Sequence, residues 1–233
     1  MYKEMTTIFV VAVVMGVGLC SVEAAIVDLT GPDGLSASAV FTLNNPTELQ
    51  ITLINNSTGV PAGFGSADQL LTGISWDFGM AVGATGTVVI GPGGQSIDFD
   101  NVITQLGPGA DVSGEWGYGN TGGTGMLTNI VSTNAAQVMR FSGANLDGPL
   151  GLDGPQGGIC TDPPWVSLGG LGAVADSVVI TLTLDTSLAN LNFLKNGVAA
   201  EFGSDAAFLP EPTTICLLGF GTLSLVTRRR TLP

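Results

Sequence analysis

The feature that most constrains the fold is a series of short segments in which apolar and polar residues alternate. A period of two places every second side chain on the same face, which is typical of a half-buried β-strand. In residues 73–78, for example, Ile74, Trp76 and Phe78 share one face. Glycine, proline and asparagine separate the segments, as they do in tight turns. The segments predicted as strands are 36–43, 49–53, 73–78, 87–90, 96–99, 138–141, 178–184 and 198–202.

Many short strands joined by glycine-rich turns predict an all-β domain, and in particular a single jelly-roll-like β-sandwich. We expect this domain to span residues 25–209, which is enough chain to bury one core without disulfides. Cys160 is its single cysteine, so no disulfide can form within the domain. Because the chain also has no histidine to activate a thiol, we expect Cys160 to be partly buried and unreactive.

The charge balance of the chain excludes several functional classes. The formal net charge is −13, and Arg140 and Lys195 are the basic residues between Ile26 and Leu209. A binder of nucleic acid or of an anionic membrane surface needs a basic face, so both functions are disfavoured. The absence of histidine removes serine–histidine catalysis and most zinc sites. We expect the acidity to keep the protein soluble.

Residues 1–24 have the organisation of a secretory signal peptide. Lys3 supplies a positive charge, and the apolar stretch of residues 8–19 is shorter than the roughly twenty residues that a membrane-spanning helix needs. Val22 and Ala24 have the small side chains that signal peptidase requires three residues and one residue before its cut. Cleavage between Ala24 and Ala25 is therefore predicted. The alternative is a leader that is kept as an anchor.

Residues 210–233 contain three elements in a fixed order. The prolines of Pro210-Glu211-Pro212 fix φ and make the triplet a stiff, extended segment. Residues 213–227 are mostly apolar, and as a helix they would be about 22 Å long, against a hydrocarbon core of about 30 Å. We expect a short transmembrane helix here. The arginines at 228–230 should remain cytoplasmic, which leaves the preceding domain outside.

This tail resembles the PEP-CTERM sorting domain, in which a Pro-Glu-Pro triplet, a short helix rich in glycine and leucine, and an arginine cluster follow one another. The matching residues are Pro210, Glu211, Pro212, the run 216–225, and Arg228, Arg229 and Arg230. The resemblance implies transient anchoring in the inner membrane and processing by an exosortase, a membrane-embedded transpeptidase. It further implies delivery to the cell surface or extracellular matrix, in association with exopolysaccharide. The alternative is a plain membrane anchor that keeps its helix.

One group of residues in the domain suggests a sugar contact. Glu115, Trp116 and Tyr118 place a carboxylate among aromatic rings, as sugar-binding surfaces do. Trp76 and Trp165 are instead expected to pack in or beside the core.

Two pairs of carboxylates are candidates for a calcium site. Asp98 and Asp100 would share a strand face, and Asp147 and Asp153 lie in a repeated Leu-Asp-Gly-Pro turn. Calcium needs six or more oxygen ligands, and no such set is evident. Solvated carboxylates and turn-stabilising side chains are the favoured interpretations, so no catalytic residue, metal or other cofactor is predicted.

Three hypotheses about function follow from these features. The first is a non-enzymatic structural or interaction protein of the cell surface, handled by signal peptidase and an exosortase-like enzyme. The second is a polysaccharide-binding module in the same place, assisted by calcium. The third is a carboxylate-based glycan hydrolase or lyase.

Overall fold

Regular structure in the described part of the chain consists of β-strands and short 3-10 helices, among them η3 (Ser113–Glu115) and η4 (Asn192–Asn196). The predicted all-β class is therefore confirmed. The computed structural model describes residues 8–12, 22–31, 34–57, 70–98, 106–121, 123, 127–133, 146, 157–161, 172–203 and 206–208.

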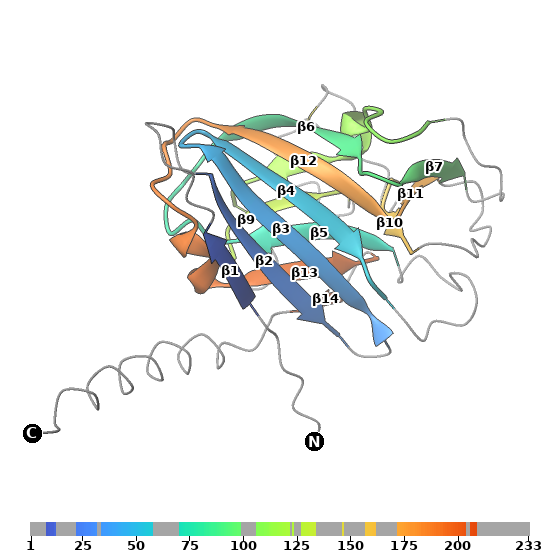
Figure 1. Ribbon diagram of the computed structural model, residues 1–233, viewed down its shortest axis with the longest axis horizontal. Helices are drawn as coiled ribbons and strands as arrows, with labels where there is room; N and C mark the ends of the chain where they lie inside the picture. Colours follow the sequence, from blue (N-terminus) through green and yellow to red (C-terminus); the bar gives the residue numbers. More distant parts are fainter. Residues whose placement is uncertain are drawn as a thin grey trace, which may run out of the picture.

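The first sheet has the strand order β1-β2-β3-β4-β12-β6, and every neighbouring pair is antiparallel (Figure 1). Its first four strands follow one another along the chain, and β12 then inserts between β4 and β6. The strands are β1 (Ile8–Ala12), β2 (Glu23–Thr30), β3 (Ser36–Asn45), β4 (Glu48–Asn55), β6 (Ala84–Ile90) and β12 (Ser177–Leu184).

The second sheet has the order β14-β13-β5-β10-β11-β7, with β9 pairing both β5 and β8. Its pairs are antiparallel except for β10 with β11, which is parallel. The strands are β5 (Leu71–Trp76), β7 (Gln95–Asp98), β8 (Gly117–Gly119), β9 (Asn129–Ser132), β10 (Ile159–Cys160), β11 (Gly172–Ala175), β13 (Val198–Phe202) and β14 (Ala206–Phe208).

The inward faces of the two sheets share one hydrophobic core. Phe41 of β3 contacts Trp76 of β5 edge to face, with 6.0 Å between ring centroids, so an aromatic pair joins the two sheets. Phe78 extends this cluster to Phe193 at a centroid distance of 4.7 Å. Ile74, Trp76 and Phe78 all belong to the core, which confirms the face predicted for residues 73–78 and the packing role predicted for Trp76.

Most of the predicted strands are present. The segments 36–43, 49–53, 87–90, 178–184 and 198–202 lie within β3, β4, β6, β12 and β13. The strand predicted at 73–78 ends at Trp76, and β7 covers 96–98 of the segment 96–99. The segment 138–141 and Trp165 lie outside the described residues. Strands that the sequence did not predict are β1, β2, β8, β9, β10, β11 and β14.

A glycine in β5 allows three strands of the second sheet to pack closely. Gly73 lies opposite Ser132 of β9 and Glu201 of β13. A Cβ at position 73 would lie 2.8 Å from the Ser132 Cβ and 2.9 Å from the Val131 carbonyl oxygen. Because real Cβ atoms do not approach other atoms so closely, any larger residue would push β9 away from β5.

Candidate functional site

The predicted cleavage site lies at the beginning of β2. Val22 is 50% exposed, whereas Ala24 and Ala25 are inside the strand and the Ala25 side chain is buried. Ala24 lies opposite Thr42 of β3 on one side and Val11 of β1 on the other. The bond between Ala24 and Ala25 is therefore enclosed by two neighbouring strands in the folded chain (Figure 1).

Glu23 connects the beginning of β2 to a distant segment. Its carboxylate accepts a hydrogen bond from the backbone N–H of Leu191, with an N···O distance of 3.0 Å. A protease needs an extended and unpaired segment at the bond that it cuts. A cut between Ala24 and Ala25 would therefore have to precede the folding of β2.

Among the residues predicted to contact sugar, Trp116 lies in the hydrophobic core. It is 0% exposed, so in this structure its indole has no free face for a sugar ring. Tyr118, in β8, is half-buried and packs against the same core, with its ring 6.4 Å from that of Trp76. Glu115 lies in η3, where it is partly exposed. The three residues are neighbours, but the aromatic rings turn inward and the stacking role stays a prediction.

The Tyr118 hydroxyl takes part in a chain of hydrogen bonds at one end of the molecule. It donates to the Val82 carbonyl oxygen at 2.7 Å and accepts from the Asn129 amide nitrogen at 2.8 Å. The Asn129 amide oxygen in turn accepts from Thr128 Oγ1 at 2.8 Å. Burial, together with the negative charge of Asp185, raises the pKa of Tyr118 to about 12, although the hydrogen bond from Asn129 acts in the opposite direction.

Two carboxylates at the same end stabilise loops. Asp77 Oδ1 accepts from the Gly79 N–H at 2.8 Å, and it lies 3.0 Å from Thr128 Oγ1, whose single hydroxyl hydrogen it shares with the Asn129 amide oxygen. Asp185 Oδ1 accepts from the Gly83 N–H at 3.0 Å. Each carboxylate satisfies a backbone N–H in a turn, which is the usual structural use of aspartate in loops.

At the other end, Asp111 stabilises the turn that leads into η3. The Ser113 backbone N–H donates to Asp111 Oδ1 at 2.8 Å, and the Ser113 hydroxyl donates to the same oxygen. These two hydrogen bonds favour the charged form and lower the pKa of Asp111.

Of the calcium candidates, Asp98 is the last residue of β7, while Asp100, Asp147 and Asp153 lie outside the described residues. Within the described ranges, no three residues among aspartate, glutamate, histidine and cysteine lie close enough together to hold a metal ion. The structure thus brings none of these predicted carboxylates into a common site within those ranges.

Glu201 of β13 is a buried carboxylate that the sequence did not single out. It is 5% exposed and accepts a hydrogen bond from the Ser132 hydroxyl at 3.3 Å. Its neighbours Ala200 and Phe202 point into the core, so Glu201 lies on the opposite face of the second sheet. The sequence carried no signal that this face is covered.

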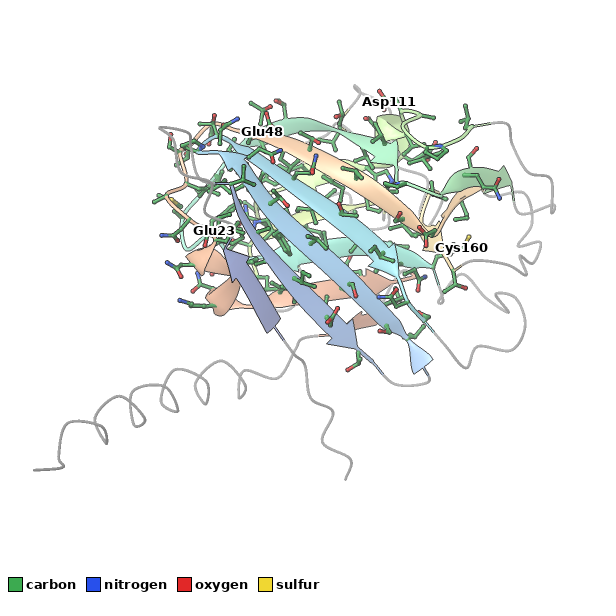
Figure 2. The ribbon with its side chains drawn as sticks, viewed as in Figure 1. Glu23, Glu48, Asp111 and Cys160 are labelled. Atoms are coloured by element: carbon green, nitrogen blue, oxygen red, sulfur yellow. The ribbon has the colours of Figure 1, made fainter. Side chains whose placement is uncertain are left out.

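Cys160 lies at the opposite end of β4 from Glu23 and Glu48 (Figure 2). It is the second residue of β10, is 1% exposed and forms no disulfide. The predicted burial of this thiol is confirmed, and its lack of reactivity stays a prediction.

The sorting residues Pro210, Glu211, Pro212 and the arginines at 228–230 lie outside the described residues, as does the apolar run 213–227. In the part of the chain that the structure describes, no helix has the length and apolar character required to cross a membrane.

Comparison of the chain with protein-family models, with curated proteins and with solved structures gives no match in any of the three.

Proposed function

We propose that this chain is an exported protein that an exosortase-like enzyme sorts to the cell surface or extracellular matrix, where it has a non-enzymatic structural or interaction role. The observation that carries the proposal is the order of the last elements: a Pro-Glu-Pro triplet, an apolar run and three arginines, directly after an acidic all-β domain. The arginines prevent the run from passing through the membrane, and the stiff triplet offers an extended segment to a processing enzyme.

We interpret the two sheets as a β-sandwich of jelly-roll type. Consecutive strands from β4 to β7 alternate between the first and the second sheet. The strands β11, β12 and β13 alternate in the same way. Such crossings support a jelly-roll arrangement, whereas β2, β3 and β4 form a simple meander. A domain of this kind needs no metal or disulfide to be stable, so it suits a spacer or an interaction module outside the cell.

The non-enzymatic role is supported by the way in which polar side chains are used. In the described part, the Tyr118 hydroxyl, Asp77, Asp111 and Asp185 each bond to backbone groups or to neighbouring side chains that hold loops. A catalytic acid or base needs to reach a substrate, and these groups are engaged in structural hydrogen bonds.

The sorting proposal is tested by changing Glu211. In a host with an exosortase, Glu211→Ala should leave a longer form of the protein in the membrane fraction, while the unchanged protein is trimmed and released. Glu48→Ala is a matched control, because it removes one carboxylate from the domain and should be processed normally. Equal trimming of Glu211→Ala and of the unchanged chain, measured by immunoblot of membrane and surface fractions, would refute the proposal.

Polysaccharide binding is the second candidate, and one observation favours it. The outward face of the first sheet carries a row of uncharged polar side chains, with neighbouring strands about 4.8 Å apart. Such a row can donate and accept hydrogen bonds along an extended, neutral glycan. The row consists of Thr42, Gln50, Thr181 and Thr87, which pair with one another across four strands.

Glycan-array binding with and without calcium tests this second function and its location. If the outward row binds, Thr181→Val should weaken binding about tenfold, and Glu115→Gln should have no effect. If Glu115→Gln weakens binding and Thr181→Val does not, the contact lies beside Trp116 and Tyr118 instead. If no neutral glycan binds, polysaccharide binding is refuted and the non-enzymatic structural or interaction role remains as the proposed function.

A further inference from the structure

The outer edge of β2 can accept an additional strand. In the structure, β1 occupies this edge in antiparallel register, so that Ile8 lies opposite Val27 and Ala12 lies opposite Glu23 (Figure 1). β1 belongs to residues 1–24, the proposed leader. If the leader is removed, β2 loses this neighbour, and the backbone N–H and C=O groups on that side lose their partners.

The opposite edge of the first sheet is covered along the last part of β6. The Ile90 N–H of β6 donates to the Ala110 carbonyl at 2.9 Å, and the Val112 N–H donates to the Val88 carbonyl at 2.9 Å. A short segment before η3 thus lies along the last part of β6 and blocks the approach of another strand. Among the described strands of the first sheet, removal of β1 would leave β2 as an open edge.

β2 lacks the features with which proteins protect an exposed edge. Between Ala25 and Thr30 it contains no proline, no lysine and no register shift in its pairing with β3. Its one charged residue there is Asp28, whose carboxylate accepts a hydrogen bond from the Ser38 hydroxyl at 2.5 Å. An unprotected edge of this kind is a template for pairing with another chain.

We propose that the edge of β2 in the processed protein pairs with the β2 edge of a second copy, which gives a two-fold dimer with one continuous sheet. This proposal rests on the removal of the leader. Antiparallel pairing of identical strands satisfies two-fold symmetry directly, because the same edge serves in both copies.

The sequence of β2 is compatible with such self-pairing. If Val27 lies opposite Val27 of the second copy, then Ile26 faces Asp28 and Ala25 faces Leu29. This register keeps Ala25, Val27 and Leu29 on the inward face, where all three are buried. No like charges meet, which matters in a chain with a formal net charge of −13.

The test is the native mass of the protein exported and processed by its host, combined with its intact mass. A chain that begins at Ala25 and has twice the mass of one copy is the expected result. Ile26→Asp should raise the dissociation constant of the dimer about a hundredfold or more, because it places a carboxylate opposite Asp28 at two symmetric positions. Val179→Asp is the matched control, since Val179 lies in the same outward row but three strands further in, and this variant should remain dimeric.

The outcomes separate this inference from the proposed function. A monomeric chain that begins at Ala25 would overturn the dimer and leave the export proposal intact. A dimer that survives Ile26→Asp with a normal circular dichroism spectrum would place the interface elsewhere. A chain that keeps residues 1–24 would overturn the dimer and leave the sorting proposal, which the C-terminal tail carries, intact, since β1 would then cover the edge. If Ile26→Asp fails to fold, hydrogen exchange in the unchanged protein decides. Gly31 donates to Leu35 across the β2–β3 ladder, so the alternating amides of Ile26 and Asp28 point to the other edge of β2. Slow exchange at these two amides supports the pairing, and rapid exchange there would refute it.

Discussion

At the scale of single residues, Tyr118 offers a clean spectroscopic test of the structure. The chain has two tyrosines, and the other one, Tyr2, lies in the proposed leader. The processed protein therefore contains Tyr118 alone, so tyrosinate absorbance reports on this one hydroxyl. We expect it to titrate with a pKa of about 12, against about 10 for a free tyrosine. An ordinary value would contradict the burial of the hydroxyl.

The same group should make stability depend on alkaline pH. The pKa is higher in the folded state than in the unfolded state, so the folded state holds its proton more tightly. The stabilisation is fully present below about pH 10 and is lost as the pH rises through about 12. Urea unfolding across this range should show the loss, and Tyr118→Phe should flatten it while costing about 1 kcal/mol at neutral pH.

Trp116 and Glu201 show the limit of residue-level prediction. Trp116 was expected beside a sugar and is fully buried, whereas Glu201, which no sequence pattern singled out, is a carboxylate that is 5% exposed. Alternation assigns a side chain to one of two faces, but it cannot say whether other segments cover the outer face. The hydrogen bond from Ser132 to Glu201 joins residues 69 positions apart, and no local pattern could reveal it.

At the scale of elements, the close packing of β5 and β9 should be sensitive to one methyl group. Gly73→Ala should destabilise the protein by about 2 kcal/mol, because the new Cβ would overlap Ser132 and the Val131 carbonyl. Gly107→Ala is the matched control, since a Cβ there meets nothing within 4 Å and should change stability by less than about 0.5 kcal/mol. Equal unfolding free energies for the two variants would contradict the strand order.

The strands that could be predicted from the sequence are those with one face toward the core. β3 and β4 alternate between buried and partly exposed residues along most of their length, and the sequence shows the same period. All residues of β9 and β10 are buried, so neither strand has a polar face that would produce alternation. β2 was missed for a different reason: its first residues were assigned to the cleavage site.

At the scale of the whole molecule, an acidic all-β domain lies between a proposed leader and a proposed sorting tail. The proposed leader has two successive roles. We propose that it directs export and that its removal uncovers an edge that pairs with a second copy. The acidity of the domain then favours pairing through a nearly uncharged strand edge over association through other surfaces.

The intact mass of material recovered from the cell surface tests the proposed processing at both ends of the chain. We predict a chain that begins at Ala25 and ends near Pro210-Glu211-Pro212, without the apolar run 213–227 and the arginines that follow it. A chain recovered with both ends untrimmed, from Met1 to Pro233, would contradict it.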